Sequence, residues 1–167
     1  FQIAPSTAEG DALITILSIN GDASVGLVRV NRVAPSIFSA DSSGQGIAAA
    51  FALRTKQDNS SIYENIARFD SAQMKFVHIP IDLGPETDQV FLLLYGTGIR
   101  FRSSLSTVTA TVGGISCQVD FAGQQADFVG LDQLNIRLPR SLIGRGEVDV
   151  VVTVDGYTAN TVKANIK

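Results

Sequence analysis

The sequence contains one residue that could serve as a catalytic base near neutral pH, the single histidine His78. One histidine cannot form a metal motif that needs two, and it leaves one candidate base for a Ser-His-Asp triad. A hydrolase would need His78 beside a serine and a carboxylate, but no Gly-x-Ser-x-Gly elbow occurs. By strand alternation His78 lies opposite to Val77, Ile79 and Ile81. We therefore expect a structural or surface histidine on the solvent side.

The single cysteine, Cys117, has the same strand parity as Ile115, Val119 and Phe121. Burial in an apolar core raises the pKa of a thiol and quenches its reactivity, so we expect a buried, inert side chain. With no second cysteine, the chain cannot form an internal disulfide.

The segment Gly96-Thr97-Gly98 begins like a dinucleotide-binding fingerprint, but the third glycine and the following helix are missing. A phosphate site of this kind depends on the N-terminus of that helix. We expect these glycines to permit a bend after a buried strand.

Three carboxylates in one loop, those of Asp82, Glu86 and Asp88, are the candidate metal ligands. Oxygen ligands that alternate in a loop can hold Ca²⁺, although this spacing matches no EF-hand. Solvated turn carboxylates are the alternative interpretation. We predict no other metal ligand, no cofactor and no catalytic residue.

A sugar site would need paired carboxylates or exposed aromatic rings. A second group of carboxylates spans several predicted hairpins and leaves glycoside chemistry open. These residues are Asp120, Asp127 and Asp132. A carbohydrate-binding module predicts an exposed aromatic row or a cation site near the three tyrosines, whereas a structural module predicts rings that are packed or isolated. The tyrosines are Tyr63, Tyr95 and Tyr157.

The charge balance argues against nucleic acid as a partner. The chain of 167 residues has 13 basic and 16 acidic side chains. Its central arginines are scattered between apolar positions and form no basic stripe, as phosphate backbones require. The longest apolar run, residues 90–95, has the length of a strand, so we expect no membrane span.

The elements that must position these residues are strands, because apolar residues recur with a period of two. Asp-Gly, Gly-Gly and Asn-Gly pairs between alternating runs predict hairpins. These hairpins comprise residues 148–166 around Asp155-Gly156, residues 108–121 around Gly113-Gly114, and residues 13–30 around Asn20-Gly21.

Further strands are predicted at residues 46–54, 62–69, 76–83, 89–95 and 133–138, although the alanine-rich run at 46–53 also has helix propensity. No window carries an apolar stripe at helical spacing. Short strands at near-regular spacing indicate an all-β fold, and we predict an immunoglobulin-like antiparallel β-sandwich with an additional N-terminal β-hairpin region.

Two blocks of the sequence match each other in the order and spacing of their motifs. Each reads as a strand, a loop with proline, and a hairpin; one begins at Phe1 and the other at Ile136. We therefore expect residues 1–33 to be the closing hairpin of one immunoglobulin-like unit. Residues 35–85 are expected to form β-hairpins that complete an N-terminal β region of residues 1–85. Residues 86–167 are expected to form the immunoglobulin-like β-sandwich.

Several separate motifs resemble the Solibacter uncharacterised C-terminal domain family. The motifs, in order, are Ala34-Pro35-Ser36-Ile37-Phe38, Gly44-Gln45-Gly46, Leu94-Tyr95-Gly96-Thr97-Gly98, residues 128–139, residues 146–156, and Asn160-Thr161-Val162. The Gly-Thr-Gly, Val-Gly-Gly and Asp-Gly segments are also similar to the IPT/TIG group of immunoglobulin-like folds. The first resemblance implies the C-terminal module of long, secreted, repeat-bearing bacterial proteins. Neither resemblance supplies catalytic residues.

We therefore expect a non-catalytic structural or interaction module of a larger secreted or cell-surface bacterial protein. The sequence opens at Phe1 in a strand-like segment with no basic and apolar leader, so a fragment without its signal peptide is expected. Its partner would be a protein or a cell-surface glycan, and open strand edges would allow association between copies. A carbohydrate-binding accessory module is the alternative, and a hydrolase that uses His78 is a third hypothesis.

Overall fold

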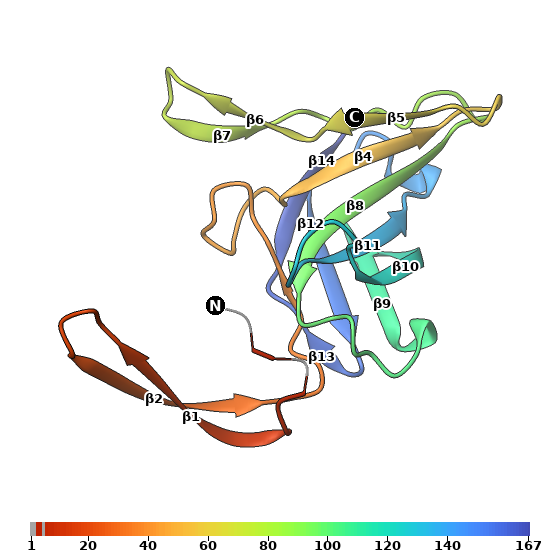
Figure 1. Cartoon of the computed structure of the whole chain (residues 1–167). Helices are drawn as coiled ribbons and strands as arrows, with labels where there is room; N and C mark the ends of the chain where they lie inside the picture. Colours follow the sequence, from red (N-terminus) through yellow and green to blue (C-terminus); the bar gives the residue numbers. More distant parts are fainter. Residues whose placement is uncertain (1–2, 5) are drawn as a thin grey trace. The chain divides into compact units, whose positions relative to one another are not determined.

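The computed structural model describes residues 3–4 and 6–167 (Figure 1). The described part is all-β with antiparallel strand pairs, and its helical segments are two short 3₁₀ helices, η1 (Leu105–Thr107) and η2 (Arg140–Leu142). The all-β prediction is therefore confirmed. The chain divides into two compact units, residues 1–32 and residues 33–167.

The first unit contains one hairpin, formed by β1 (Gly10–Leu17) and β2 (Ala23–Val30). Its register runs from Gly10 opposite Val30 to Leu17 opposite Ala23, and the turn places Gly21 at φ +89°. The hairpin predicted around Asn20-Gly21 is therefore confirmed. Of the strand and proline expected before it, Phe1, Gln2 and Pro5 lie outside the described residues.

The second unit is built on one ten-stranded sheet of described residues. Its strands follow the spatial order β13-β12-β9-β10-β11-β8-β4-β5, with β14 paired to β12 and β3 paired to β8. The strands are β3 (Ser36–Ile37), β4 (Ala50–Thr55), β5 (Ser61–Asn65), β8 (Gln89–Thr97), β9 (Val108–Val112), β10 (Ile115–Gln124), β11 (Asp132–Arg137), β12 (Gly146–Val154), β13 (Tyr157–Thr158) and β14 (Val162–Ile166).

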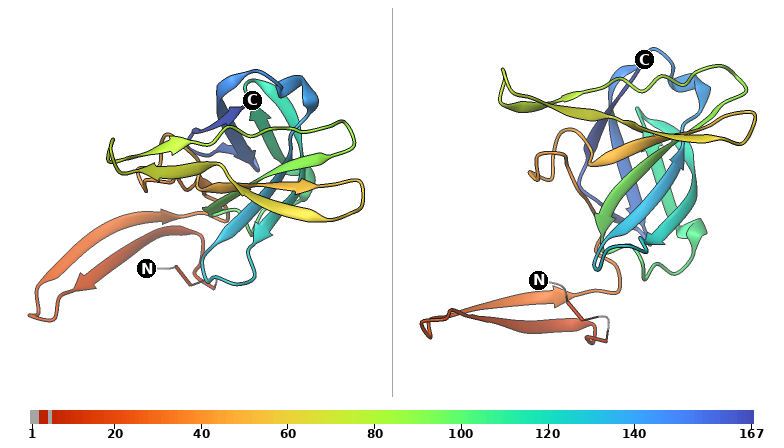
Figure 2. Two further views of the ribbon diagram at one scale, coloured as in Figure 1. Left: turned by 90° about the horizontal axis from the view of Figure 1, so that it is seen from above. Right: turned by 45° about the horizontal axis from the view of Figure 1, so that its top comes forward.

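Strand β10 folds this sheet into two layers. Its first residues pair with β9 and its later residues pair with β11, with a register shift between Val119 and Phe121. A bulge of this kind bends a strand and increases its twist, which turns the second half of the sheet over the first. As a result, β8 and β11 lie across β9 and β12 (Figures 1 and 2). This arrangement is an antiparallel β-sandwich, and its relation to immunoglobulin-like folds stays a prediction.

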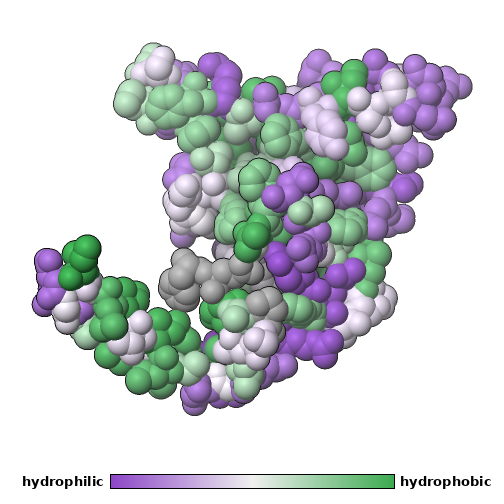
Figure 3. Space-filling model, viewed as in Figure 1, coloured by the Kyte–Doolittle hydropathy of each residue, from purple (hydrophilic) through white to green (hydrophobic). Residues whose placement is uncertain are grey.

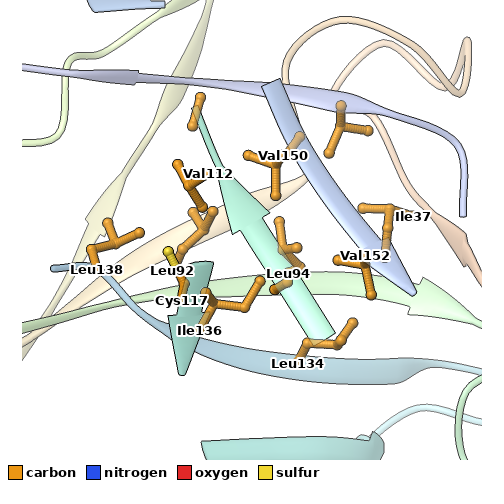
Figure 4. Close-up of a cluster of buried hydrophobic side chains, with 14 of the residues drawn as sticks. Ile37, Leu92, Leu94, Val112, Cys117, Leu134, Ile136, Leu138, Val150 and Val152 are labelled. Carbon is orange, nitrogen blue, oxygen red and sulfur yellow. The ribbon is translucent and has the colours of Figure 1, made fainter. Parts of the chain in front are cut away.

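The core lies between the two layers (Figure 4). Leu92, Leu94 and Ile136 come from β8 and β11, and they face Val150 and Val152 of β12. All five side chains are buried, as strand alternation requires when one face of each layer points inward.

The outer edge of β14 is covered by two short parallel bridges. Ile47 pairs with Lys163, and Ile81 pairs with Ile166. The segments near residues 47 and 81 therefore close this edge, whereas β5 ends the sheet on the other side. An edge that is paired presents no free backbone groups to another chain.

The hairpin of β6 (Ala67–Asp70) and β7 (Lys75–His78) extends beyond the sandwich as a separate two-stranded sheet (Figure 2). The single strand predicted at residues 62–69 is therefore wrong, because the chain turns inward at the buried Ile66 and divides into β5 and β6. The strand predicted at residues 76–83 ends at His78, two residues before Pro80, which has no N–H to donate to a ladder.

The unit boundary lies at residues 32 and 33, and the expected boundary near residue 85 is wrong. Strand β4 pairs with β8 from Ala50 opposite Leu94 to Thr55 opposite Gln89, so residues from both sides of position 85 share one sheet. Tertiary pairing also decides the secondary structure of the alanine-rich run, because its residues from Ala50 onward belong to strand β4.

Candidate functional site

His78 lies partly buried at the end of β7. Its side chain is only 15% exposed, and its Nε2 atom lies 3.1 Å from the carboxylate of Glu147 on β12. Its Nδ1 atom is buried and has no hydrogen-bond partner among the described residues. The expectation that His78 faces solvent is therefore wrong, because the end of β7 brings the ring next to β12.

The loop of the predicted calcium ligands is held by cations of the protein. Asp82 accepts a hydrogen bond from the Gly84 amide at 2.8 Å and one from the Lys167 ammonium at 3.0 Å. These contacts lower the pKa of Asp82, the Gly84 amide having the larger effect. Asp88 lies 3.2 Å from the guanidinium of Arg54. Among the described residues no three His, Cys, Asp or Glu side chains gather as a metal site, so the structure does not support calcium at Asp82, Glu86 and Asp88.

Two arginines fix the backbone of the same loop. The buried Arg54 binds Glu64 at 2.8 Å and the carbonyl of Asp82 at 2.5 Å. Arg140 donates to the carbonyls of residues 83, 84 and 85. Gly84 lies so close to the Arg54 side chain that a Cβ added to this glycine would be 2.3 Å from Arg54 Nη1. The charges of this loop therefore hold structure together.

The second group of carboxylates is dispersed over separate contacts. Asp132 is fully buried, and it accepts hydrogen bonds from the Ile99 amide at 2.7 Å and from Arg100 Nε at 2.7 Å. Asp120 pairs with Arg137 at 3.0 Å, and Asp127 accepts from a glutamine side chain. The structure therefore forms no carboxylate pair from these three residues.

Gly96 and Gly98 permit a close backbone approach. A Cβ at Gly96 would lie 2.2 Å from the carbonyl oxygen of Ser36, and one at Gly98 would lie 2.0 Å from that of Ala34. Gly98 also has φ +74°, a conformation that favours glycine. The predicted bend after a buried strand is confirmed.

Cys117 is buried, as predicted, and desolvation raises the pKa of its thiol. It lines a recess of about 260 Å³ together with Leu83, Val90 and Leu138. A protonated thiol among apolar side chains is a poor nucleophile.

The outer side of the β5-β4-β8-β11-β10 layer carries a group of aromatic side chains, which we call the aromatic face. Its members are Phe51, Tyr63, Phe91, Tyr95 and Phe121. Strand register places them on one side, since Phe51 is opposite Leu93, Leu93 is opposite Asn135, and Asn135 is opposite Phe121. Phe91 and Tyr95 flank Leu93 on β8 with the same parity.

Three of these rings contact one another edge to face. The ring of Phe51 lies 6.3 Å from that of Tyr63 at 88° and 6.2 Å from that of Tyr95 at 85°. Tyr63 is 64% exposed, whereas Tyr95 is half-buried and desolvation raises the pKa of its hydroxyl. Edge-to-face pairs are favourable and hold rings in a fixed arrangement.

Polar side chains border the aromatic face along β11. Arg137 lies over the Phe91 ring, with its guanidinium carbon 5.3 Å from the ring centroid, and it pairs with Asp120. The Gln133 amide donates to Asn135 at 2.7 Å. An apolar centre with a polar border is the composition of a binding surface.

The sequence named only Tyr63 and Tyr95 of this face. Outward parity on β8 could have added Phe91, whereas Phe51 depends on which strands pair. Phe121 was expected on the same side as the buried Cys117, and that expectation is wrong because the register of β10 shifts between Val119 and Phe121. Tyr157, the third tyrosine, lies on β13 at the opposite end of the sheet order and is exposed.

The comparisons with family models, curated proteins and solved structures found no match. The family resemblance of the sequence therefore stays a prediction. No helix in the described part of the chain has the length and apolar character of a membrane span.

Proposed function

We propose that the chain is a non-catalytic interaction module of a larger secreted or cell-surface protein, and that its binding surface is the aromatic face. The proposal is carried by one observation, a group of rings on the outer side of the sheet with a polar border. Tyr63 and Phe121 are exposed, the other rings are partly buried, and the core packs against the opposite side of the sheet. Aromatic anchors surrounded by polar side chains are typical of protein–protein contacts. The extracellular location rests on the resemblance to secreted, repeat-bearing proteins.

The ion pairs of the sandwich support a scaffold role. Arg54, Arg100 and Arg140 hold the loops at residues 82–88 and 98–100, where their charges satisfy carboxylates and backbone carbonyls. Loops fixed in this way keep the strands beneath the aromatic face in register. A preorganised face loses little entropy when it binds.

Photo-crosslinking tests this proposal. Tyr63 is replaced by a photoreactive phenylalanine analogue, and the matched control carries the same analogue at Tyr157, which is exposed but lies off the aromatic face. We expect discrete protein adducts from position 63 in the secreted and surface fraction of the producing cells, and none from position 157. Equal labelling from the two positions, or none from position 63, would contradict the proposal. An adduct of twice the chain mass identifies a second copy, which the β5 edge would allow.

A carbohydrate-binding accessory module is the second candidate. It is favoured by the exposure of Tyr63 and by the amides of Gln133 and Asn135, which lie on the same side of the sheet three strands away, since open rings stack on sugars and amides hydrogen-bond to hydroxyl groups. The edge-to-face arrangement leaves fewer open ring faces than a flat platform would, and for this reason we place it second.

A glycan array with and without calcium separates the two candidates. Binding that disappears in Tyr63→Ala and persists in Tyr157→Ala would establish the carbohydrate function. Because among the described residues no three acidic, His or Cys side chains gather as a metal site, we expect calcium to leave the result unchanged. An array without a hit, together with crosslinks from position 63, would support the protein partner.

A further inference from the structure

The hairpin of the first unit has the same strand register as the last hairpin of the sandwich. The pairs of β1 and β2 correspond one by one to pairs of β12 and β14, at a constant difference of 136 residues from Gly10 to Gly146 and from Val30 to Ile166. Gly10–Val30, Ala12–Val28 and Ile14–Gly26 match Gly146–Ile166, Val148–Ala164 and Val150–Val162. In this register Val28 is equivalent to Ala164.

Local details support this equivalence. Gly10 and Gly146 both have a positive φ, +131° and +66°, at the first position of the strand. Each is followed by an acidic residue, and Asp11 and Glu147 both pair with a basic residue of the partner strand. Asp11 pairs with the directly opposite Arg29 at 3.0 Å, whereas Glu147 pairs with Lys163, the equivalent of Leu27, at 3.2 Å.

The inner cross-strand pair also keeps its total size. In the first hairpin the alanine is on β1 and the valine on β2, as Ala12 and Val28. In the last hairpin the valine is on β12 and the alanine on β14. When the large and the small side chain of a cross-strand pair change places, their combined volume stays the same. An opposing layer can therefore pack against either pair equally well.

The equivalent positions differ in what covers them. In the sandwich, Val152 is 0% exposed, and β12 pairs with β9 from Val150 opposite Val112 to Val154 opposite Val108. In the first hairpin the equivalent of Val152 is Ile16, which is 59% exposed, and β1 pairs with β2 in a two-stranded sheet. Apolar residues predominate along the strands of the hairpin (Figure 3). A two-stranded hairpin is marginally stable in water without further strands.

We infer that β1 and β2 close a second β-sandwich of the same kind, whose other strands precede them in the polypeptide. The edge of β1 from Ile14 onward receives an antiparallel strand of the β9 type, in which apolar residues alternate with threonine. The inner side of Ala12, Ile14 and Ile16 packs against a layer equivalent to β8 and β11. The missing strands precede the hairpin because, in the complete unit, β3 to β11 all precede β12. The inference deepens the proposed function and rests on its premise that the chain belongs to a larger protein.

The outer side of the hairpin supplies a matched pair of substitutions. Leu13 opposite Leu27 corresponds to Asp149 opposite Lys163, which form an ion pair at 3.1 Å. The two leucines are 68% and 74% exposed. Leu13→Asp with Leu27→Lys should therefore be tolerated, whereas Ile14→Asp places a charge on the inner side and should prevent docking.

The test adds the missing strands from the chain itself. Residues 33–136 are fused in front of the whole chain, so that Phe1 takes the place of Arg137 and the hairpin takes the place of β12 and β14. The control fusion adds residues 33–167, whose sandwich already has its own closing hairpin. We expect amide hydrogen exchange of residues 10–30 to slow by about 100-fold or more in the first fusion only. This protection should persist with Leu13→Asp and Leu27→Lys and should disappear with Ile14→Asp.

Equal exchange of the hairpin in both fusions would overturn the inference. An added segment that stays unfolded in the first fusion but folds in the control would overturn it too. Concentration-dependent protection in the unfused chain, with a dimer in sedimentation, would assign the hairpin to a second copy instead. The crosslinking at Tyr63 does not use the hairpin, so the proposed function and this inference fail separately.

Discussion

At the scale of single residues, Asp132 shows how a buried charge can organise a loop. Its carboxylate accepts hydrogen bonds from the amides of Ile99 and Arg100 and pairs with the Arg100 guanidinium. A buried charge needs such partners because desolvation without them is costly. The loop after β8 thereby gains a fixed path.

Asp132→Asn is expected to reduce the free energy of unfolding by about 2–4 kcal/mol, since it leaves the Arg100 charge without its counter-charge. Urea denaturation measures the loss. The control is Asp149→Asn, which breaks an exposed pair with Lys163 and should reduce the free energy of unfolding much less, because solvent screens this pair. Equal losses in the two variants would show that burial of Asp132 contributes nothing.

The loop around Asp41 gives a prediction for acid pH. Hydrogen bonds from the side chain of Ser43, and then from that of Ser39, lower the pKa of Asp41 from 3.8 to about 2. A carboxylate with a lowered pKa stabilises the folded state above its unfolded pKa. That contribution is lost as the pH falls through the folded pKa, so this loop should keep its order from pH 4 down to about 2.

Carboxyl NMR titration should find the midpoint of Asp41 near pH 2, and Ser43→Ala should raise it toward 3.8. Ser106→Ala removes a hydroxyl that bonds to Ser104, far along the chain from this loop, and should leave the midpoint unchanged. A wild-type midpoint near 3.8 would contradict the role of these serines.

At the scale of elements, Asn160 connects the loop after β3 to the link between β13 and β14. Its side chain accepts from the Ser36 hydroxyl at 3.0 Å and from the Ile37 amide at 2.8 Å, and it donates to the carbonyls of Ile37 and Gly44. Four hydrogen bonds from one side chain join segments that are more than 100 residues apart in sequence.

Asn160→Ala is expected to reduce the free energy of unfolding by about 2–3 kcal/mol, because several partly buried groups lose a partner. Hydrogen exchange should quicken at Ile37 and in residues 39–48. Asn135→Ala is the control, since that amide accepts from Gln133 on the outer side of the sheet, and it should cost about 1 kcal/mol or less. If hydrogen exchange of residues 39–48 is unchanged in Asn160→Ala, then Asn160 does not hold this loop in place.

At the scale of the whole molecule, substitutions at the equivalent positions Ile14 and Val150 test whether the two units unfold separately. Val150 is buried in the sandwich, so Val150→Asp should unfold residues 33–167, with a loss of about 4 kcal/mol or more. Ile14→Asp in the unfused chain should leave the unfolding midpoint of residues 33–167 unchanged. Urea denaturation followed by NMR of each unit measures both. An equal loss in the two variants would mean that the chain unfolds as one unit.

The sequence by itself determined the local elements. Asp155-Gly156 and Gly113-Gly114 predict tight hairpins, and the structure gives all four residues a positive φ, which the backbone of such turns requires. Alternation of apolar residues predicts strands with one buried side, and Cys117 and the alternate valines of β12 lie there: Val148, Val150, Val152 and Val154. These features depend on neighbours in the chain, so local physics is sufficient to predict them.

Only the tertiary structure decided which strands are neighbours. Pairing of β4 with β8 joins residues from both sides of position 85 in one unit, gathers Phe51 with Tyr95, and brings Asp88 to Arg54. The bridge of Ile81 with Ile166 brings Asp82 to Lys167. The approach of β7 to β12 likewise buries His78 against Glu147. Such contacts join residues far apart in sequence, and many pairings satisfy the same alternation of side chains. The pairing that buries the most apolar surface with every backbone group bonded is a property of the whole chain.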